Sequence, residues 1–166
     1  MFKIKRSTYI KMLTHFKENH LQYKLLKFLY KFLPVAVVIF YPILVVFTAI
    51  WDTAELLKVI CIPAVVLTII TIIRKVINRP RPYEKFKTES LFCKQTSGES
   101  MPSRHTASAF IIAMTALYVN TYIGMVMLGV SLIIAISRVL AGVHFISDVI
   151  TASVISISFG MLFFII

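Results

Sequence analysis

The stretch SRVLAGVHFISD, residues 137–148, places Arg138, His144 and Asp148 within sequence that is otherwise apolar enough for a membrane interior. Ionisable groups at such positions are costly and mark functional sites. On a helix, His144 and Asp148 would share one face, so the carboxylate would orient the imidazole and leave one ring nitrogen free to react. Arg138 supplies a permanent charge that suits phosphate or carboxylate. Taken alone, the stretch also fits a helix end with a self-satisfied His-Asp pair.

The composition of the 166-residue chain is that of a membrane protein. Hydrophobic residues make up 58% of it and its mean hydropathy is +0.86, well above the range of soluble domains. Its net charge of +11 comes mainly from residues 1–31 and 74–104, which carry eight Lys or Arg each. This distribution favours membrane anchoring and phosphate binding, and no nucleic acid is expected as a partner. Cys61 and Cys93 predict no disulfide framework.

Apolar segments predict an all-α fold, an integral membrane helical bundle with about five transmembrane helices. Residues 32–51 and about 56–73 form two spans, residues 106–137 form two more with a break near Asn120–Gly124, and residues 149–166 form the last. Residues 1–31 interleave lysines with apolar residues, which predicts an amphipathic helix at the membrane interface and no removable signal peptide; a solvated basic tail is the alternative. The expected division is a basic N-terminal segment, 1–31, and a membrane-embedded domain, 32–166.

Five spans would bring three polar clusters to the same side of the membrane. In the first, Arg74 and Arg81 can surround the oxygens of an anion. In the second, residues 102–105 (PSRH) open an apolar helix, where Ser103 is a suitable N-cap and free backbone N–H groups bind anions. The third is the 137–148 stretch. Each of the first two clusters alone also fits an ordinary basic loop or a structural histidine, but together the three predict one polar site.

The three clusters, in this order, resemble the signature of the type 2 phosphatidic acid phosphatase superfamily, which also includes the vanadium haloperoxidases. The matching positions are Arg74, Arg81-Pro82, Pro102-Ser103-Arg104-His105, Ser137-Arg138, His144 and Asp148. Two positions depart from the usual pattern, because Arg74 stands in place of lysine and Arg104 in place of glycine. Arginine at position 104 would be strained if the backbone there required a positive φ. We expect these departures to affect substrate choice more than activity.

The resemblance implies a membrane lipid phosphatase that forms a phosphohistidine. His144 would attack phosphorus, and Asp148 would orient the His144 ring. His105 would protonate the leaving oxygen and then activate water. The residues that would hold the phosphate are Arg74, Arg81, Ser103, Arg104 and Arg138. No metal site or other cofactor is expected, because the chain lacks an Asp/Glu cluster for Mg²⁺ and a third convincing zinc ligand.

The substrate implied by the resemblance is a lipid phosphate: phosphatidate, phosphatidylglycerophosphate, or a polyprenyl phosphate or diphosphate. A lipid phosphotransferase with the same histidine chemistry and a non-enzymatic membrane anion carrier are the alternatives. The family implies an extracytoplasmic active site in the cell membrane, which we expect, although the basic N-terminal segment favours a cytoplasmic site by the positive-inside rule. The sequence predicts no oligomeric state.

Overall fold

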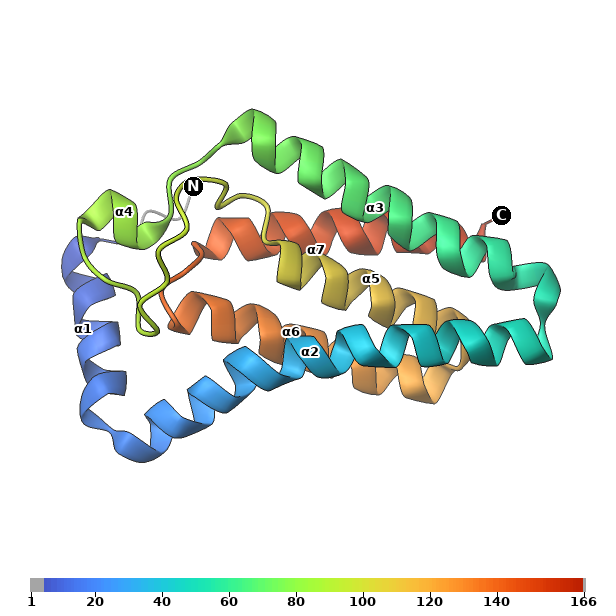
Figure 1. Ribbon diagram of the computed structural model, residues 1–166, viewed down its shortest axis with the longest axis horizontal. Coiled ribbons are helices and arrows are strands. Elements are labelled where there is room, and N and C mark those ends of the chain that lie inside the picture. The colour runs from blue at the N-terminus through green and yellow to red at the C-terminus, as the bar shows by residue number, and fades with distance from the viewer. Residues whose placement is uncertain (1–4, 166) are drawn as a thin grey trace.

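The computed structural model describes residues 5–165, and within this range its regular elements are all helices (Figure 1). The long helices run alongside one another, which confirms the predicted all-α bundle. They are α2 (His20–Trp51), α3 (Leu56–Ile77), α5 (Arg104–Val119), α6 (Thr121–Leu140) and α7 (Ile146–Gly160). The shorter elements are α1 (Arg6–Glu18), α4 (Pro82–Phe86) and the 3-10 helices η1 (Thr53–Glu55) and η2 (Met161–Phe164).

The helices identify an integral membrane protein. The stretches that contain α2, α3, α6 and α7 are long and apolar enough to cross a membrane. The remaining long helix, α5, has 16 residues and contacts the other four. From Thr106 to Ala116, every residue of α5 except Ser108 is buried. The third predicted span is therefore a short central helix that the other four surround.

The basic N-terminal segment is divided into two helices. α1 ends at Glu18, and α2 begins at His20 and continues to Trp51, so the expected boundary at residue 31 falls inside α2. Asn19 separates them, because its side-chain oxygen accepts a hydrogen bond from the Gln22 N–H at 3.2 Å and so caps α2. α1 lies across the end of the bundle, which is the orientation expected for an interfacial helix (Figure 1). Residues 1–4 lie outside the described range, and the two-segment division stays a prediction.

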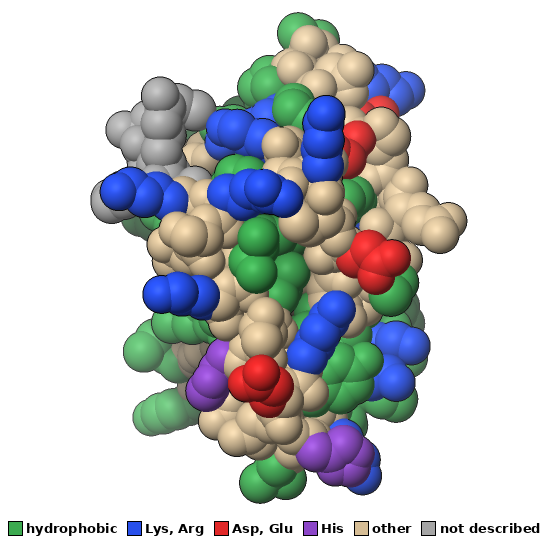
Figure 2. Space-filling model, turned by 90° about the vertical axis from the view of Figure 1, so that its left-hand side faces the viewer, with side chains coloured by type: hydrophobic (Ala, Val, Ile, Leu, Met, Phe, Trp, Pro, Cys, Tyr) green, Lys and Arg blue, Asp and Glu red, His purple; other side chains and the backbone are tan. Residues whose placement is uncertain are grey.

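The polar segments lie together at the end of the bundle that α1 crosses. The α3–α5 connection, residues 78–103, and the α6–α7 loop, residues 141–145, both reach this end (Figure 1). Figure 2 views the molecule from this side, and Lys and Arg side chains are spread over the surface. The topology therefore places the three predicted clusters next to one another.

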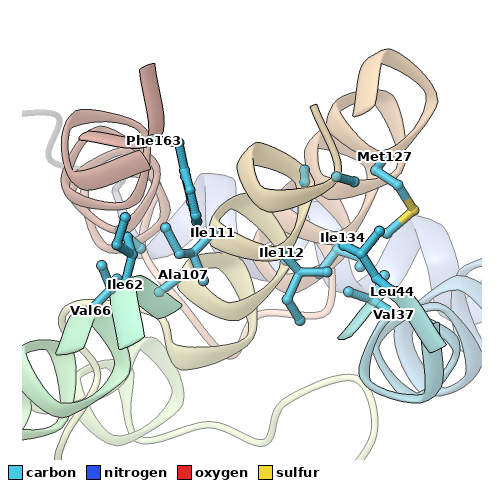
Figure 3. Packing of buried hydrophobic residues seen from close by; sticks show 14 of the residues in the cluster. Val37, Leu44, Ile62, Val66, Ala107, Ile111, Ile112, Met127, Ile134 and Phe163 are labelled. Atoms are coloured by element: carbon cyan, nitrogen blue, oxygen red, sulfur yellow. The ribbon is translucent and has the colours of Figure 1, made fainter. Parts of the chain in front are cut away.

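The core of the bundle is packed around both sides of α5. Ala107 and Ile111 point toward α3 and Phe163, and Ile112 points toward α2 and α6 (Figure 3). The Ser156 hydroxyl on α7 donates a hydrogen bond to the Ala107 carbonyl at 3.1 Å. Helices in a bilayer are held by close van der Waals packing and interhelical hydrogen bonds, and a small residue such as Ala107 permits that approach.

The predicted break in residues 106–137 occurs at Asn120, which ends α5. The side-chain oxygen of Asn120 accepts a hydrogen bond from the Ile123 N–H at 3.1 Å and caps α6. Gly124 permits the reversal, because a Cβ atom at this position would overlap the backbone of Leu117. The break therefore lies at the first residue of the predicted interval.

Candidate active site

A cavity of about 600 Å³ at this end of the bundle contains residues from all three clusters. Its charged and imidazole lining comprises Arg74, Arg81, Lys94, Glu99, Arg104, His105 and His144. Another part of the wall is apolar and comes from Pro34, Val37 and Val38 of α2 and Ala109 of α5. Val38 is 59% exposed on the bundle surface, so the cavity borders the part of α2 that faces the membrane. The space therefore combines a cationic region with an apolar one.

His144 lies in the loop before α7, and the prediction that it shares a helix face with Asp148 is wrong. The two side chains are nevertheless neighbours, with 3.5 Å between His144 Nδ1 and Asp148 Oδ2. This distance is longer than an optimal hydrogen bond. Because Nδ1 faces Asp148, Nε2 is the nitrogen left for the cavity.

The His144 ring is neutral near physiological pH. Burial lowers its pKa to about 4, and the charges of Arg81 and Arg74 act in the same direction. The hydrogen-bonding and charge interaction with Asp148 opposes this shift without cancelling it. A neutral imidazole has a lone pair available for attack.

The loop that carries His144 is held by α1. Gly142 has a φ of +72°, which favours glycine, and its carbonyl accepts a hydrogen bond from the buried Tyr9 hydroxyl at 3.0 Å. Burial raises the pKa of Tyr9 to about 12, so the phenol keeps its proton and can donate it. The preceding carbonyl, that of Ala141, accepts from the Leu91 N–H at 3.1 Å. Segments distant in sequence therefore fix the position of His144.

The Asp148 carboxylate is fully buried and accepts hydrogen bonds at both oxygens. Oδ2 accepts from the Phe145 N–H at 2.9 Å and from the Ser100 hydroxyl at 2.5 Å, and Oδ1 accepts from Arg79 Nη1 at 2.6 Å. Arg79 and Ser100 were not among the predicted site residues. They lie 69 and 48 residues from Asp148, so no local pattern indicates these contacts.

Arg74 and Arg81 are both buried and both line the cavity. Arg74 Nη1 donates to the Pro102 carbonyl at 2.8 Å, and Nη2 lies 3.6 Å from Glu99 Oε2. Arg81 Nε donates to the Gly98 carbonyl at 3.0 Å. Arg74 Nε and Arg81 Nη1 are buried, and neither has a hydrogen-bond acceptor among the residues that the structure describes. Because buried donors normally have a partner, these two atoms fit an anion bound in the cavity.

The other three predicted phosphate ligands differ in position. Arg104 lines the cavity, and as the first residue of α5 it has a helical backbone, so it is not strained where the family usually has glycine. Arg138 is buried and is absent from the cavity lining; its Nη2 donates to the Tyr30 carbonyl at 2.9 Å, and its guanidinium carbon lies 4.1 Å from the Tyr30 ring centroid. Ser103 is the N-cap residue of α5, but its hydroxyl accepts from Thr106 and caps no backbone N–H.

Lys94 is a further cation that the sequence analysis did not identify. It lines the cavity, and its pKa is lowered by burial and by the charges of Arg81, Arg138 and Arg74. A single lysine in a polar loop carries no signal of its own, so only the folded loop indicates its position.

Within residues 5–165, no group of three His, Cys, Asp or Glu residues is arranged to hold a metal ion. The cavity lining is therefore mainly cationic, with two imidazoles and the carboxylate of Glu99.

Residues 54–166 match the family model of the PAP2 superfamily. The chain belongs to the PAP2 superfamily. This PAP2 chain is 33% identical over 98 residues to the undecaprenyl-diphosphatase BcrC of Bacillus subtilis (strain 168), an alignment that covers 59% of the chain and 50% of the relative. The chain thus spans about half the length of this curated relative. The family resemblance predicted from the three clusters is confirmed.

Two solved structures share the fold of this PAP2 chain. The crystal structure of Aquifex aeolicus LpxE has a TM-score of 0.64 and 22% identity, and the match covers 86% of this chain and 94% of that one. The PAP2 type phosphatidylglycerolphosphate phosphatase from Bacillus subtilis has a TM-score of 0.67 and 16% identity, with 95% and 83% covered. The predicted membrane bundle is therefore an arrangement already seen in this superfamily.

Proposed function

We propose that the chain is a membrane lipid phosphatase that transfers a phosphate from a lipid to His144 and then to water, without a metal ion. One observation carries this proposal: the neutral His144 ring shares a cavity with Arg74, Arg81 and Arg104, and part of the same wall is the apolar surface of α2. The arginines suit a phosphate headgroup, and the apolar wall suits the first part of a lipid chain.

In the first step, the lone pair on His144 Nε2 attacks phosphorus and the bond from phosphorus to the lipid oxygen breaks. His105, in its protonated form, gives a proton to that oxygen, and the negative charge of the bound phosphate favours this form. In the second step, His105 accepts a proton from water, the water oxygen attacks phosphorus, and the P–N bond breaks. The products are inorganic phosphate and the lipid with one phosphate fewer, which is a lipid monophosphate where the substrate is a diphosphate.

The arginines stabilise the charge that develops on the phosphate oxygens during both steps. Arg74 and Arg81 are held by the Pro102 and Gly98 carbonyls, so their guanidinium groups are oriented before the substrate binds. Such preorganised donors are typically the largest single contribution to catalysis. Arg104 adds a third cation at the cavity wall, and Arg138 and Ser103 are proposed to support the phosphate from behind it.

A lipid-phosphate panel tests the reaction. The purified protein in EDTA is expected to release phosphate from at least one lipid phosphate, and His144→Ala is expected to abolish release. Because a curated relative is an undecaprenyl-diphosphatase, polyprenyl diphosphate is placed first in the panel, followed by polyprenyl phosphate, phosphatidylglycerophosphate and phosphatidate. Activity that EDTA abolishes, or that His144→Ala retains, would contradict the mechanism. Labelled phosphate that reaches a lipid acceptor but never water would identify a transferase instead.

We also propose that the site faces the extracytoplasmic side of the cell membrane. Cys93 lies exposed in the α3–α5 connection and reports on this side, and Cys61→Ser removes the other cysteine. A membrane-impermeant maleimide is expected to label Cys93 in intact cells. Labelling that occurs only after the cells are opened would place the site in the cytoplasm.

A further inference from the structure

Arg79 is the charged group that contacts the buried Asp148. Its Nη1 donates to Asp148 Oδ1 at 2.6 Å and to the Ser147 hydroxyl at 2.7 Å, and its guanidinium carbon lies 4.3 Å from the Phe145 ring centroid. Its own carbonyl accepts a hydrogen bond from the Ser100 N–H at 2.9 Å, and the Ser100 hydroxyl donates to Asp148 Oδ2. Arg79 is therefore fixed against the first turn of α7 from several directions.

We propose that Arg79 is a positioning residue that balances the charge of Asp148 and fixes the orientation of its carboxylate, so that Asp148 holds the His144 ring in place while the ring stays neutral. This inference rests on the proposed histidine chemistry. Arg79 does not line the cavity, so it acts on the reaction through Asp148 and not on the substrate.

The two oxygens of Asp148 have separate functions in this arrangement. Oδ1 is occupied by Arg79, and Oδ2 faces His144 Nδ1 at 3.5 Å. With Arg79 removed, the carboxylate would keep the hydrogen bonds that Oδ2 accepts from the Phe145 N–H and the Ser100 hydroxyl, but Oδ1 would lose its charged partner and be free to turn. Arg79 also lies between Arg74 and Arg81 in sequence. Its contact with Asp148 therefore connects the segment that would hold the phosphate to the start of α7, beside the proposed nucleophile.

The charge of Arg79 has a second consequence for His144. The groups that face His144 are Asp148 from α7, Arg74 and Arg81 from α3 and the loop after it, and His105 from α5. Asp148 favours the protonated ring, and the arginines oppose it. Without Arg79, the negative charge of Asp148 would be uncompensated on the Oδ1 side. The protonated form of His144 would then persist to higher pH, and less of the nucleophile would be available.

Arg79→Gln tests the proposal, because glutamine keeps a donor but removes the charge. We expect kcat to fall roughly tenfold to a hundredfold, the range set by one charge-assisted hydrogen bond, with KM nearly unchanged. The second readout is the pH dependence of His144 modification by diethyl pyrocarbonate, followed by mass spectrometry in the absence of substrate. Its midpoint is expected to rise by about one pH unit or more.

Three further variants separate charge from geometry. Arg79→Lys keeps the charge and is expected to keep the wild-type midpoint, with a kcat between those of Arg79→Gln and the wild type. Ser100→Ala removes an uncharged donor to the same carboxylate, so it is expected to lower kcat while moving the midpoint less than Arg79→Gln does. Lys75→Gln changes an exposed cation on the last turn of α3 and is the matched control, with wild-type values expected throughout.

A wild-type midpoint in Arg79→Gln, or a rise in KM with kcat unchanged, would overturn the proposal. If Arg79→Gln is too unstable for kinetic assays, its double variant with Asp148→Asn removes both charges of the buried pair and is expected to unfold at a higher temperature than Arg79→Gln. If the double variant unfolded at a lower temperature than Arg79→Gln, Arg79 would not be balancing the charge of Asp148 and the proposal would be overturned. Retained activity in His144→Ala would instead refute the proposed function, whereas an inactive His144→Ala beside a wild-type-like Arg79→Gln refutes this inference alone.

Discussion

Replacing Gly142 by alanine is expected to damage both stability and catalysis. Gly142 lies two residues before His144 with a φ of +72°, and its carbonyl accepts the Tyr9 hydrogen bond. A Cβ atom at this position would lie 2.6 Å from the Tyr9 hydroxyl oxygen and 3.1 Å from Leu13 Cδ2. The methyl group therefore meets α1 at the point where α1 holds the loop that carries His144.

The expected cost combines two effects. A non-glycine residue in the left-handed region costs about 1–2 kcal/mol. Displacement of Tyr9 removes a hydrogen bond with a net contribution of about 0.5–1.5 kcal/mol. We expect Gly142→Ala to lower the free energy of unfolding by about 2–3 kcal/mol, or the thermal midpoint by roughly 5–10 °C in detergent. A shift of His144 by about 1 Å would lower kcat on the order of a hundredfold.

The matched control is Gly129→Ala on α6, where an added Cβ atom has no neighbour within 4 Å. Alanine is favoured over glycine in a helix by about 0.5–1 kcal/mol, so this variant should be slightly more stable and fully active. Thermal unfolding in detergent and phosphate release are measured on both variants. If Gly142→Ala matched Gly129→Ala in midpoint and kcat, α1 would not position the loop and the reasoning would be refuted.

Three further outcomes follow from the site. Arg81→Gln should lower kcat/KM by about a hundredfold or more, measured by phosphate release, because it removes a preorganised donor; a loss below tenfold would exclude Arg81 as a phosphate ligand. His144 should react with diethyl pyrocarbonate in its neutral form above its pKa and stop reacting as the pH falls through about 4; a midpoint near the ordinary value of 6.5 would contradict its burial. Tyr30→Ala should reduce kcat, because Arg138 loses the ring beneath it. Tyr41→Ala is the control, because Tyr41 lies on the same helix but donates to the Val59 carbonyl, and equal losses would argue against a specific effect.

The membrane architecture was predictable because crossing a bilayer is largely a matter of length and charge. Uncharged runs of about 20 residues indicate membrane spans directly in the sequence, without knowledge of how the helices pack. Asn120 divides the longest of these runs, because its side chain caps the next helix. The division at Asn19 was harder to predict, since the lysines before and after it are equally dense. Helix capping decided that boundary, whereas the prediction relied on charge.

The composition of the site was predictable from the three clusters, but its internal geometry was not. The spacing of His144 and Asp148 fits a helix, yet Asp148 accepts the Phe145 N–H and so defines the start of α7 after His144. The contacts of Arg79, Ser100 and Lys94 join segments far apart in the chain, where one sequence carries no pairing signal. Arg138 and Ser103 carry the expected residue types, but the first is held by Tyr30 and the second by Thr106.

The supports that α1 and α2 give to the site affect how the protein can be shortened. Tyr9 holds the loop of Gly142, and Tyr30 holds Arg138, yet both precede the region shared with the family, which begins at residue 54. A truncation that starts at the family boundary would keep all the signature residues and lose both tyrosines. We therefore expect such a fragment to release phosphate from a lipid much more slowly than the 166-residue chain.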